Sequence, residues 1–190
     1  FQGWNDMVDR GTYPQRDRPG GYEQYSDCMA HFIRDVRKDL AAPKLPFVIG
    51  VMGVSGPIKG RRKRLVHGNF RAAMAQPAEL REFRGNVVAV ATSPFWDTKL
   101  DEVAQRMDKV RKMERMLRTK NKNHANKDGS MSKQQQRAYI DEYSKEVISD
   151  EDAAMFARGA SNAGYHYLGC AKTMAQIGYA FADALLQLQR

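Results

Sequence analysis

The chain has 190 residues, of which 42% are hydrophobic, and its formal net charge is +9. This length suits one domain of ordinary size, and no stretch approaches the roughly 20 apolar residues that a membrane span requires. Two cysteines, Cys28 and Cys170, lie far apart in the sequence. They provide neither a disulfide framework nor metal-ligand spacing, so we expect both to be small core residues.

The positive charge is concentrated in two segments, residues 59–64 and residues 109–133. Basic segments of this kind raise the question of nucleic-acid binding. Neither segment contains an aromatic residue that would stack on a base. We therefore interpret both as solvated surface and expect no nucleic-acid partner, and keep nucleic-acid binding as a third, minor hypothesis.

The first six residues, Phe1–Asp6, read Phe-Gln-Gly-Trp-Asn-Asp. An aromatic residue followed by Gln-Gly and Trp-Asn-Asp is typical of a buried strand that ends in a loop. We therefore expect this chain to be the C-terminal part of a longer enzyme. Glycines and prolines among charges predict a loop over residues 10–22, and apolar residues at helical spacing predict a helix over residues 22–40.

Two short apolar runs rich in β-branched residues follow, over residues 47–54 and 86–92. Such runs are typical of fully buried strands in parallel sheets. Between them the sequence predicts a basic loop and then a short helix over residues 69–76. The order helix, strand, helix, strand favours a parallel α/β sheet.

The next segment is polar and helical in pattern. It predicts helices over residues 100–121 and 133–147, with Ser132 as the N-cap of the second. Together they resemble a helical hairpin over residues 100–147 inserted outside the core, which serves either as a cover for the active site or as an inert elaboration. A last helix is predicted from after His166 to the C-terminus, with one apolar face made of Met174, Ile177, Phe181, Ala184, Leu185 and Leu188.

One of the four histidines stands out as a candidate for catalysis. His166 lies in a stretch of small residues, 159–169, and is flanked by Tyr165 and Tyr167. Small residues leave room to direct a side chain, and a histidine can act as a general base near neutral pH. The spacing alone is also compatible with a structural histidine. The other three, His31, His67 and His124, need no functional explanation.

At the other end of the chain, Asn5 and Asp6 occupy a place where a strand end would meet a cleft. In open α/β sheets, ligands bind outside the carboxyl ends of the strands. An asparagine amide at such a place can donate a hydrogen bond to a developing oxyanion. The same residues are equally compatible with a turn in which a side chain bonds the backbone.

These two ends resemble motifs of the sialate O-acetylesterase-type carbohydrate esterases of the SGNH hydrolase superfamily. Residues 1–6 resemble a conserved block of that family, Q-G-E-S/A-N or, in one bacterial branch, Q-G-W-N-D. Residues 164–172 resemble its final block, F/Y-H-Y-L-G-S/C-A. Residues 29–37, 45–50 and 95–97 also look like that branch, so the resemblance spans nearly the whole chain.

The resemblance implies a flavodoxin-like three-layer α/β/α fold, here incomplete at the N-terminus, and a serine esterase mechanism. His166 corresponds to the histidine that deprotonates the serine, and Asn5 lies in the block that supplies a side-chain oxyanion donor. The neighbours of these two residues would form the substrate-binding wall, namely Gln2, Gly3, Trp4, Asp6 and Tyr165. The family's G-Q-S-N-M nucleophile motif does not occur in these 190 residues.

One position departs from the superfamily pattern D-x-x-H, in which the aspartate orients the histidine. The residue three before His166 is Ala163, and Asn162 precedes it. An asparagine accepts a hydrogen bond from the imidazole but supplies no negative charge. The orienting group is Asn162, Asp6 or a residue that this sequence does not contain, and we rank Asn162 first. Asp97 is a more distant candidate, because it already has a structural role as a helix N-cap.

The leading hypothesis is a serine-type carbohydrate esterase that removes O-acetyl groups from sugars, with no cofactor and no metal. Its partner is an acetylated carbohydrate, and we expect neither a nucleic acid nor a membrane. The alternative is a non-catalytic carbohydrate-binding or interaction protein on the same fold. The identity of the acetylated sugar does not follow from the sequence.

Overall fold

The computed structural model describes residues 2–58, 60–120 and 122–189, and for residues 61–64 the backbone alone. Phe1 and Lys59, which belong to the N-terminal motif and the first basic segment, therefore lie outside the described residues. The chain divides into two compact units. The first comprises Phe1–Trp96, Gly164–Tyr167 and Ala171–Arg190, and the second comprises Asp97–Ala163 and Leu168–Cys170.

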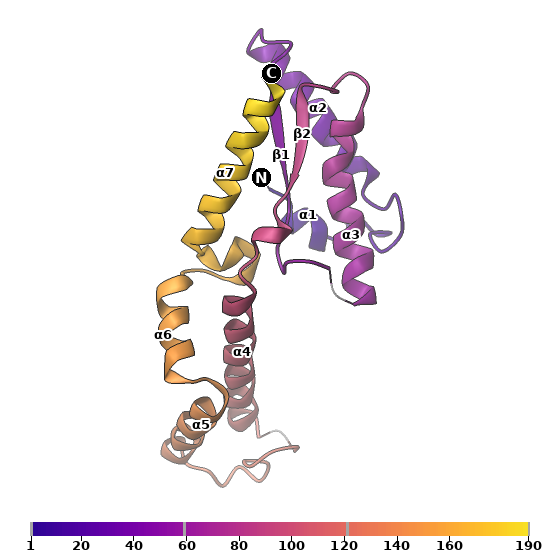
Figure 1. Cartoon of the computed structure of the whole chain (residues 1–190). Helices are drawn as coiled ribbons and strands as arrows, with labels where there is room; N and C mark the ends of the chain where they lie inside the picture. The colour runs from indigo at the N-terminus through magenta and orange to yellow at the C-terminus, as the bar shows by residue number, and fades with distance from the viewer. Residues whose placement is uncertain (1, 59, 121, 190) are drawn as a thin grey trace. The chain divides into compact units, whose positions relative to one another are not determined.

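The first unit is built on a small parallel sheet. Strands β1 (Phe47–Val51) and β2 (Val87–Ala91) pair in parallel, from Phe47 opposite Val87 to Val51 opposite Ala91. Helix α7 (Ala171–Leu188) lies on one side of the sheet, and α2 (Glu23–Asp39) and α3 (Arg61–Ala75) lie on the other (Figure 1). The structure is thus a mostly helical α/β fold with a two-stranded parallel sheet packed between helices, which confirms the predicted α/β class at that level.

The predicted helix over residues 22–40 is confirmed as α2. Its buried face includes Tyr25, Ala30 and Ile33, at the spacing that an amphipathic helix requires. The central core joins this face to both strands and to the segment before β2, through Ala30, Ile33, Ile49, Phe83 and Val87. Burying apolar side chains from both layers is the main stabilising contribution to such a unit.

Both strands are shorter than predicted, and α3 is longer. Strand β1 ends at Val51 because the chain then turns, with the Gly56 N–H donating to the Gly53 carbonyl at 2.8 Å. Helix α3 begins at Arg61, so the expected loop over the basic segment is wrong. Arginine, lysine and leucine are good helix formers, and the segment contains no proline to prevent a helix. The 3₁₀ turn η1 (Gln76–Glu79) follows α3.

The N-terminal segment also differs from the prediction. Residues 2 and 3 are not in a strand, and Trp4–Val8 form a short helix, α1, in place of the expected loop. Met7 anchors this helix in the core with 1% of its surface exposed. The prediction that both cysteines are core residues is wrong for Cys28, which is exposed, and confirmed for Cys170, which is buried.

The C-terminal helix is confirmed as α7, although its apolar face is only partly covered. Ile177 and Ala184 are buried, whereas Met174 is 40% exposed. No described helix combines the length and apolar character that crossing a bilayer requires. The first unit also contains the 3₁₀ turn η2 (Ser93–Phe95) and the first four residues of the 3₁₀ turn η3 (Gly164–Gly169).

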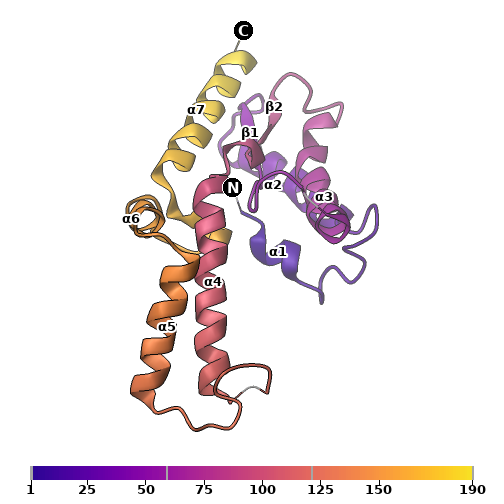
Figure 2. The ribbon, with the colours of Figure 1, turned by 60° about the horizontal axis from the view of Figure 1, so that its bottom comes forward.

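The described residues of the second unit form the helices α4 (Thr98–Arg118), α5 (Lys133–Val147) and α6 (Asp150–Gly159). Helices α4 and α5 lie side by side, as predicted for the hairpin (Figure 2). The bounds of α5 and its N-cap Ser132 are confirmed. Helix α6 is not among the predicted elements, and the unit extends on both sides of residues 100–147.

Candidate active site

A cleft of about 680 Å³ lies in the first unit, beyond the carboxyl end of β1. It combines residues from the N-terminal segment, from the chain directly after β1, from η3 and from α7. Parallel strands present their carboxyl ends at one edge of a sheet, where α/β proteins bind ligands. The cleft is lined by Gln2, Gly3, Trp4, Asn5, Asp6, Met52, Val54, Tyr165, His166, Tyr167 and Met174.

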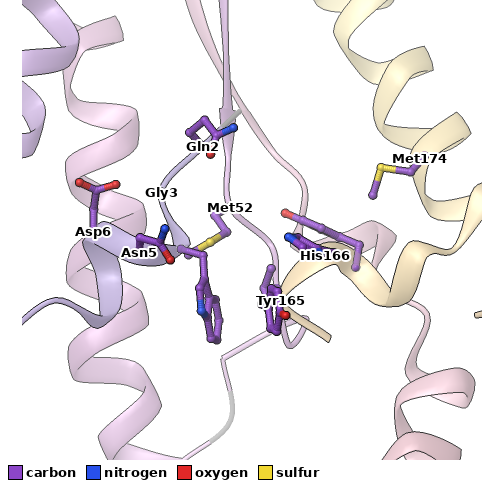
Figure 3. A pocket seen from close by; sticks show the side chains of 11 residues that line it. Gln2, Gly3, Asn5, Asp6, Met52, Tyr165, His166 and Met174 are labelled. Atoms are coloured by element: carbon purple, nitrogen blue, oxygen red, sulfur yellow. The ribbon is translucent and has the colours of Figure 1, made fainter. Parts of the chain in front are cut away.

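The two residues that carry the catalytic prediction lie in this one cleft. Asn5 projects from α1, and His166 projects from η3 on the other side in the view of Figure 3, with Met52 between them. Both side chains are exposed. All five predicted substrate-binding residues, Gln2, Gly3, Trp4, Asp6 and Tyr165, also line the cleft.

The N-terminal segment is held at the cleft by contacts with α2 and α3. A side chain at Gly3, whose φ is 140°, would place its Cβ 2.8 Å from the Phe70 ring, so only glycine fits. The Tyr25 hydroxyl donates to the Gln2 carbonyl at 3.2 Å, and the Tyr22 hydroxyl donates to the Met7 carbonyl at 2.7 Å. These bonds fix the direction in which α1 presents Asn5.

Two backbone N–H groups that follow β1 already donate hydrogen bonds within the protein. The Met52 N–H donates to the Met74 sulfur at 3.3 Å, and the Gly53 N–H donates to the Tyr167 hydroxyl at 2.6 Å. Neither is available to bind an oxyanion in the cleft. The exposed Asn5 lines the same cleft, and a side-chain amide carries two N–H donors.

Aromatic rings form part of the cleft wall. The rings of Trp4 and Tyr165 stack with centroids 5.8 Å apart and an interplanar angle of 29°. The Tyr165 ring also contacts the His166 imidazole edge-on, with centroids 4.4 Å apart. Flat apolar faces next to a few polar groups are typical of small-molecule sites. Tyr165 therefore joins the two sides of the cleft.

A half-buried arginine, Arg71, supports the turn after β1. The Arg71 guanidinium donates to the carbonyls of Val54 and Gly56, both at 3.0 Å. Burial lowers the pKa of Arg71, while the nearby Tyr167 has the opposite, smaller influence. Its Nε atom is buried and has no hydrogen-bond partner among the described residues. The positive charge thus lies behind the cleft wall to which Val54 contributes.

The expected orienting group of His166 stays a prediction. Asn162 belongs to the second unit, and its side-chain oxygen accepts a hydrogen bond from the Ala163 N–H at 2.7 Å. Asp97 has the predicted capping role, because its side chain accepts a hydrogen bond from the Leu100 N–H at 3.1 Å. Within residues 2–58, 60–120 and 122–189, no cluster of three or more histidine, cysteine or acidic side chains is placed to hold a metal ion.

Sequence reasoning did not identify several residues that shape the cleft. Thr92 is fully buried and bonds the Tyr167 hydroxyl at 2.7 Å, and Arg71 holds the turn after β1. A threonine at the end of a predicted strand and a tyrosine beside the candidate histidine were visible signals. The arginine carried no signal, since it lies in a segment with many other cations.

Comparison with protein-family models, with curated proteins and with solved structures finds no match to this chain. The function of the cleft is therefore inferred from its own residues and from the motifs at the two ends of the chain.

Proposed function

We propose that this chain carries the histidine and a side-chain oxyanion donor of a serine-type carbohydrate esterase, which removes O-acetyl groups from sugars. The proposal includes the flavodoxin-like three-layer SGNH hydrolase fold. The observation that supports it best is the meeting of Asn5 and His166 in one cleft beyond the carboxyl end of β1. These residues come from the two motifs that resemble the esterase family.

The chemistry follows from what each group can do. His166 would take the proton from a serine hydroxyl as that oxygen attacks the acetyl carbonyl, and would then return the proton to the departing sugar hydroxyl. The carbonyl oxygen gains negative charge in the tetrahedral intermediate. The Asn5 amide would donate a hydrogen bond to it, and losing one such donor typically costs about 10²–10³-fold in rate.

The proposal places the serine nucleophile upstream of these 190 residues, in which no G-Q-S-N-M motif occurs. The exposed position of His166 suits that requirement, since its imidazole is open to the cleft. The stacked pair Trp4 and Tyr165 offers a flat apolar wall beside the polar groups. A sugar ring has both an apolar face and hydroxyl edges, which fits such a wall.

The test uses a polypeptide that includes the upstream serine motif, with p-nitrophenyl acetate as substrate. We expect hydrolysis, and we expect His166→Ala to lower kcat at least about a hundredfold, because general base catalysis is lost. His31→Ala is the matched control, since His31 is an exposed histidine in α2 of the same unit. Undiminished turnover in His166→Ala would exclude the proposed role of that histidine.

The alternative function, non-catalytic carbohydrate binding on the same fold, is favoured by one feature. Ala163 stands three residues before His166, where the superfamily pattern has an aspartate. Without that carboxylate an imidazolium ion is less stabilised. If the polypeptide with the serine motif binds acetylated sugar but does not react with a serine-directed phosphonate, the alternative replaces the esterase.

A further inference from the structure

The Tyr167 side chain connects η3 to the ends of both strands. Only 4% of its surface is exposed, although its neighbours Tyr165 and His166 are exposed in the cleft. Its hydroxyl accepts the Gly53 N–H at 2.6 Å and lies 2.7 Å from the Thr92 hydroxyl. Gly53 lies two residues after the end of β1, and Thr92 is the first residue after β2. One hydroxyl therefore bridges the carboxyl ends of the parallel pair.

The direction of the protons in this network is determined by the acceptors. The Thr92 hydroxyl donates to the Val51 carbonyl at 2.8 Å, and a carbonyl can only accept. Because a threonine hydroxyl has a single hydrogen, the Tyr167 hydroxyl must donate to Thr92. The resulting chain runs from Tyr167 to Thr92 to Val51, with Gly53 donating to Tyr167. Each hydroxyl then donates once and accepts at least once.

The network is possible only because the strand ends approach closely. A Cβ atom at Gly53 would lie 2.2 Å from the backbone nitrogen of Ser93, so no other residue fits there. The Tyr167 backbone is in the left-handed region, with a φ of 54°, which is uncommon for a bulky residue. Such a conformation persists where surrounding contacts hold it, and the Tyr167 hydroxyl makes two such contacts.

We propose that the buried Tyr167–Thr92 hydrogen bond fixes the turn that presents His166 to the cleft. Tyr167 is then a positioning residue, since its hydroxyl points into the sheet while the adjacent imidazole points into the cleft. The expected effect of Tyr167 on kcat rests on the proposed function. The structural consequence, a rigid His166 backbone, is measurable in the chain without any enzymatic activity.

The first measurement is ¹⁵N relaxation of the Tyr165 and His166 backbone amides in the whole 190-residue chain. We expect order parameters of about 0.85 in the original protein and below about 0.6 in Tyr167→Phe, the values of rigid and flexible backbone. Phenylalanine keeps the ring and its contact with Trp96, at a centroid distance of 5.9 Å, and removes only the hydroxyl. Tyr179→Phe is the control, since Tyr179 is 80% exposed.

A second pair of variants tests the same bond from the strand. Thr92→Val keeps the shape and removes the hydroxyl, so it should loosen residues 165 and 166 as Tyr167→Phe does. Thr92→Ser restores a hydroxyl and should restore the order parameters. If Tyr167→Phe does not fold, this pair carries the test. Order parameters of 165 and 166 that stay at the original values in folded Tyr167→Phe or Thr92→Val would overturn the inference.

Activity provides the catalytic readout and separates the two proposals. In the polypeptide with the serine motif, Tyr167→Phe should lower kcat about tenfold or more with little change in KM, because the acetyl ester still binds. Loss of order at His166 without hydrolysis by the unmodified polypeptide would leave the positioning role standing and reject the esterase. Hydrolysis by the unmodified polypeptide, with unchanged order parameters in Tyr167→Phe, would support the esterase and reject the positioning role of Tyr167.

Discussion

The two units of this chain stabilise their helices in different ways. In the first unit, α1, α2 and α3 begin without a side-chain cap, and α2 alone buries five residues. In the second unit, α4, α5 and α6 all begin with a side chain that accepts a backbone N–H, while α5 and α6 have no buried residue.

The difference shows how local and tertiary contributions substitute for one another. A helix whose apolar face is buried tolerates unsatisfied N–H groups at its first turn, because packing provides most of its stability. A polar helix depends more on caps, each of which typically contributes about 1 kcal/mol. The cleft lies entirely in the unit stabilised by packing, where a catalytic side chain can be held rigidly.

The largest expected effect is on the first unit's core. Phe70 is fully buried and makes edge-on contacts with Tyr22 and Tyr25, with centroid distances of 4.9 and 4.7 Å. Phe70→Ala should lower the free energy of unfolding by about 3–5 kcal/mol, measured by urea denaturation. Phe32→Ala is the control, because Phe32 is 56% exposed. Equal losses in both variants would contradict the packing account.

A second prediction uses pH. Burial raises the pKa of Tyr25 to about 12 in the folded state, whereas a tyrosine in an unfolded chain titrates near 10. The folded state therefore holds this proton more tightly. The stabilisation is complete below about pH 10 and is lost as the pH rises to about 12, which amounts to about 2–3 kcal/mol.

The matching experiment compares the original protein with Tyr25→Phe. The difference between their free energies of unfolding should shrink by about 2–3 kcal/mol between pH 9 and pH 12, since phenylalanine does not titrate. Tyr179→Phe, at an exposed site on α7, should leave the pH dependence unchanged. Parallel curves for the original protein and Tyr25→Phe would show that this hydroxyl is not buried.

The smallest expected effect concerns the second unit's caps. Ser132 and Gln135 form a reciprocal capping box at the start of α5, with hydrogen bonds of 3.2 and 2.8 Å. Ser132→Ala should cost about 1 kcal/mol, measured as a change in the denaturation of the α4–α5 segment. Gln134→Ala, at an exposed position of the same helix, should change little. If the two variants behave alike, caps do not stabilise this unit.

Much of the fold could be predicted from the sequence because its signals are local. The β-branched runs predicted both strands, and the spacing of Tyr25, Met29 and Ile33 predicted α2. Short or polar elements were missed, since five residues of α1 are too few to show a period and the start of α3 has little apolar content. Helix α6 was missed although Ser149 caps it.

The candidate site was predictable only at its two ends. The motifs around Asn5 and His166 pointed to the cleft because they resemble known blocks, and the structure places both there. The supporting contacts were not predictable, since Thr92 and Tyr167 are 75 residues apart and meet only in the folded chain. Arg71 likewise reaches the turn after β1 only through the packing of α3.

The most direct test of the central claim, that Asn5 and His166 serve one sugar site, is an NMR titration of this chain. An O-acetylated methyl glycoside is the ligand, and the same glycoside without acetyl groups is the control. The account predicts that the Asn5 side-chain amide and the His166 imidazole signals shift together, with one dissociation constant and a weaker response to the control. Shifts at only one of the two residues, or at neither, would contradict it.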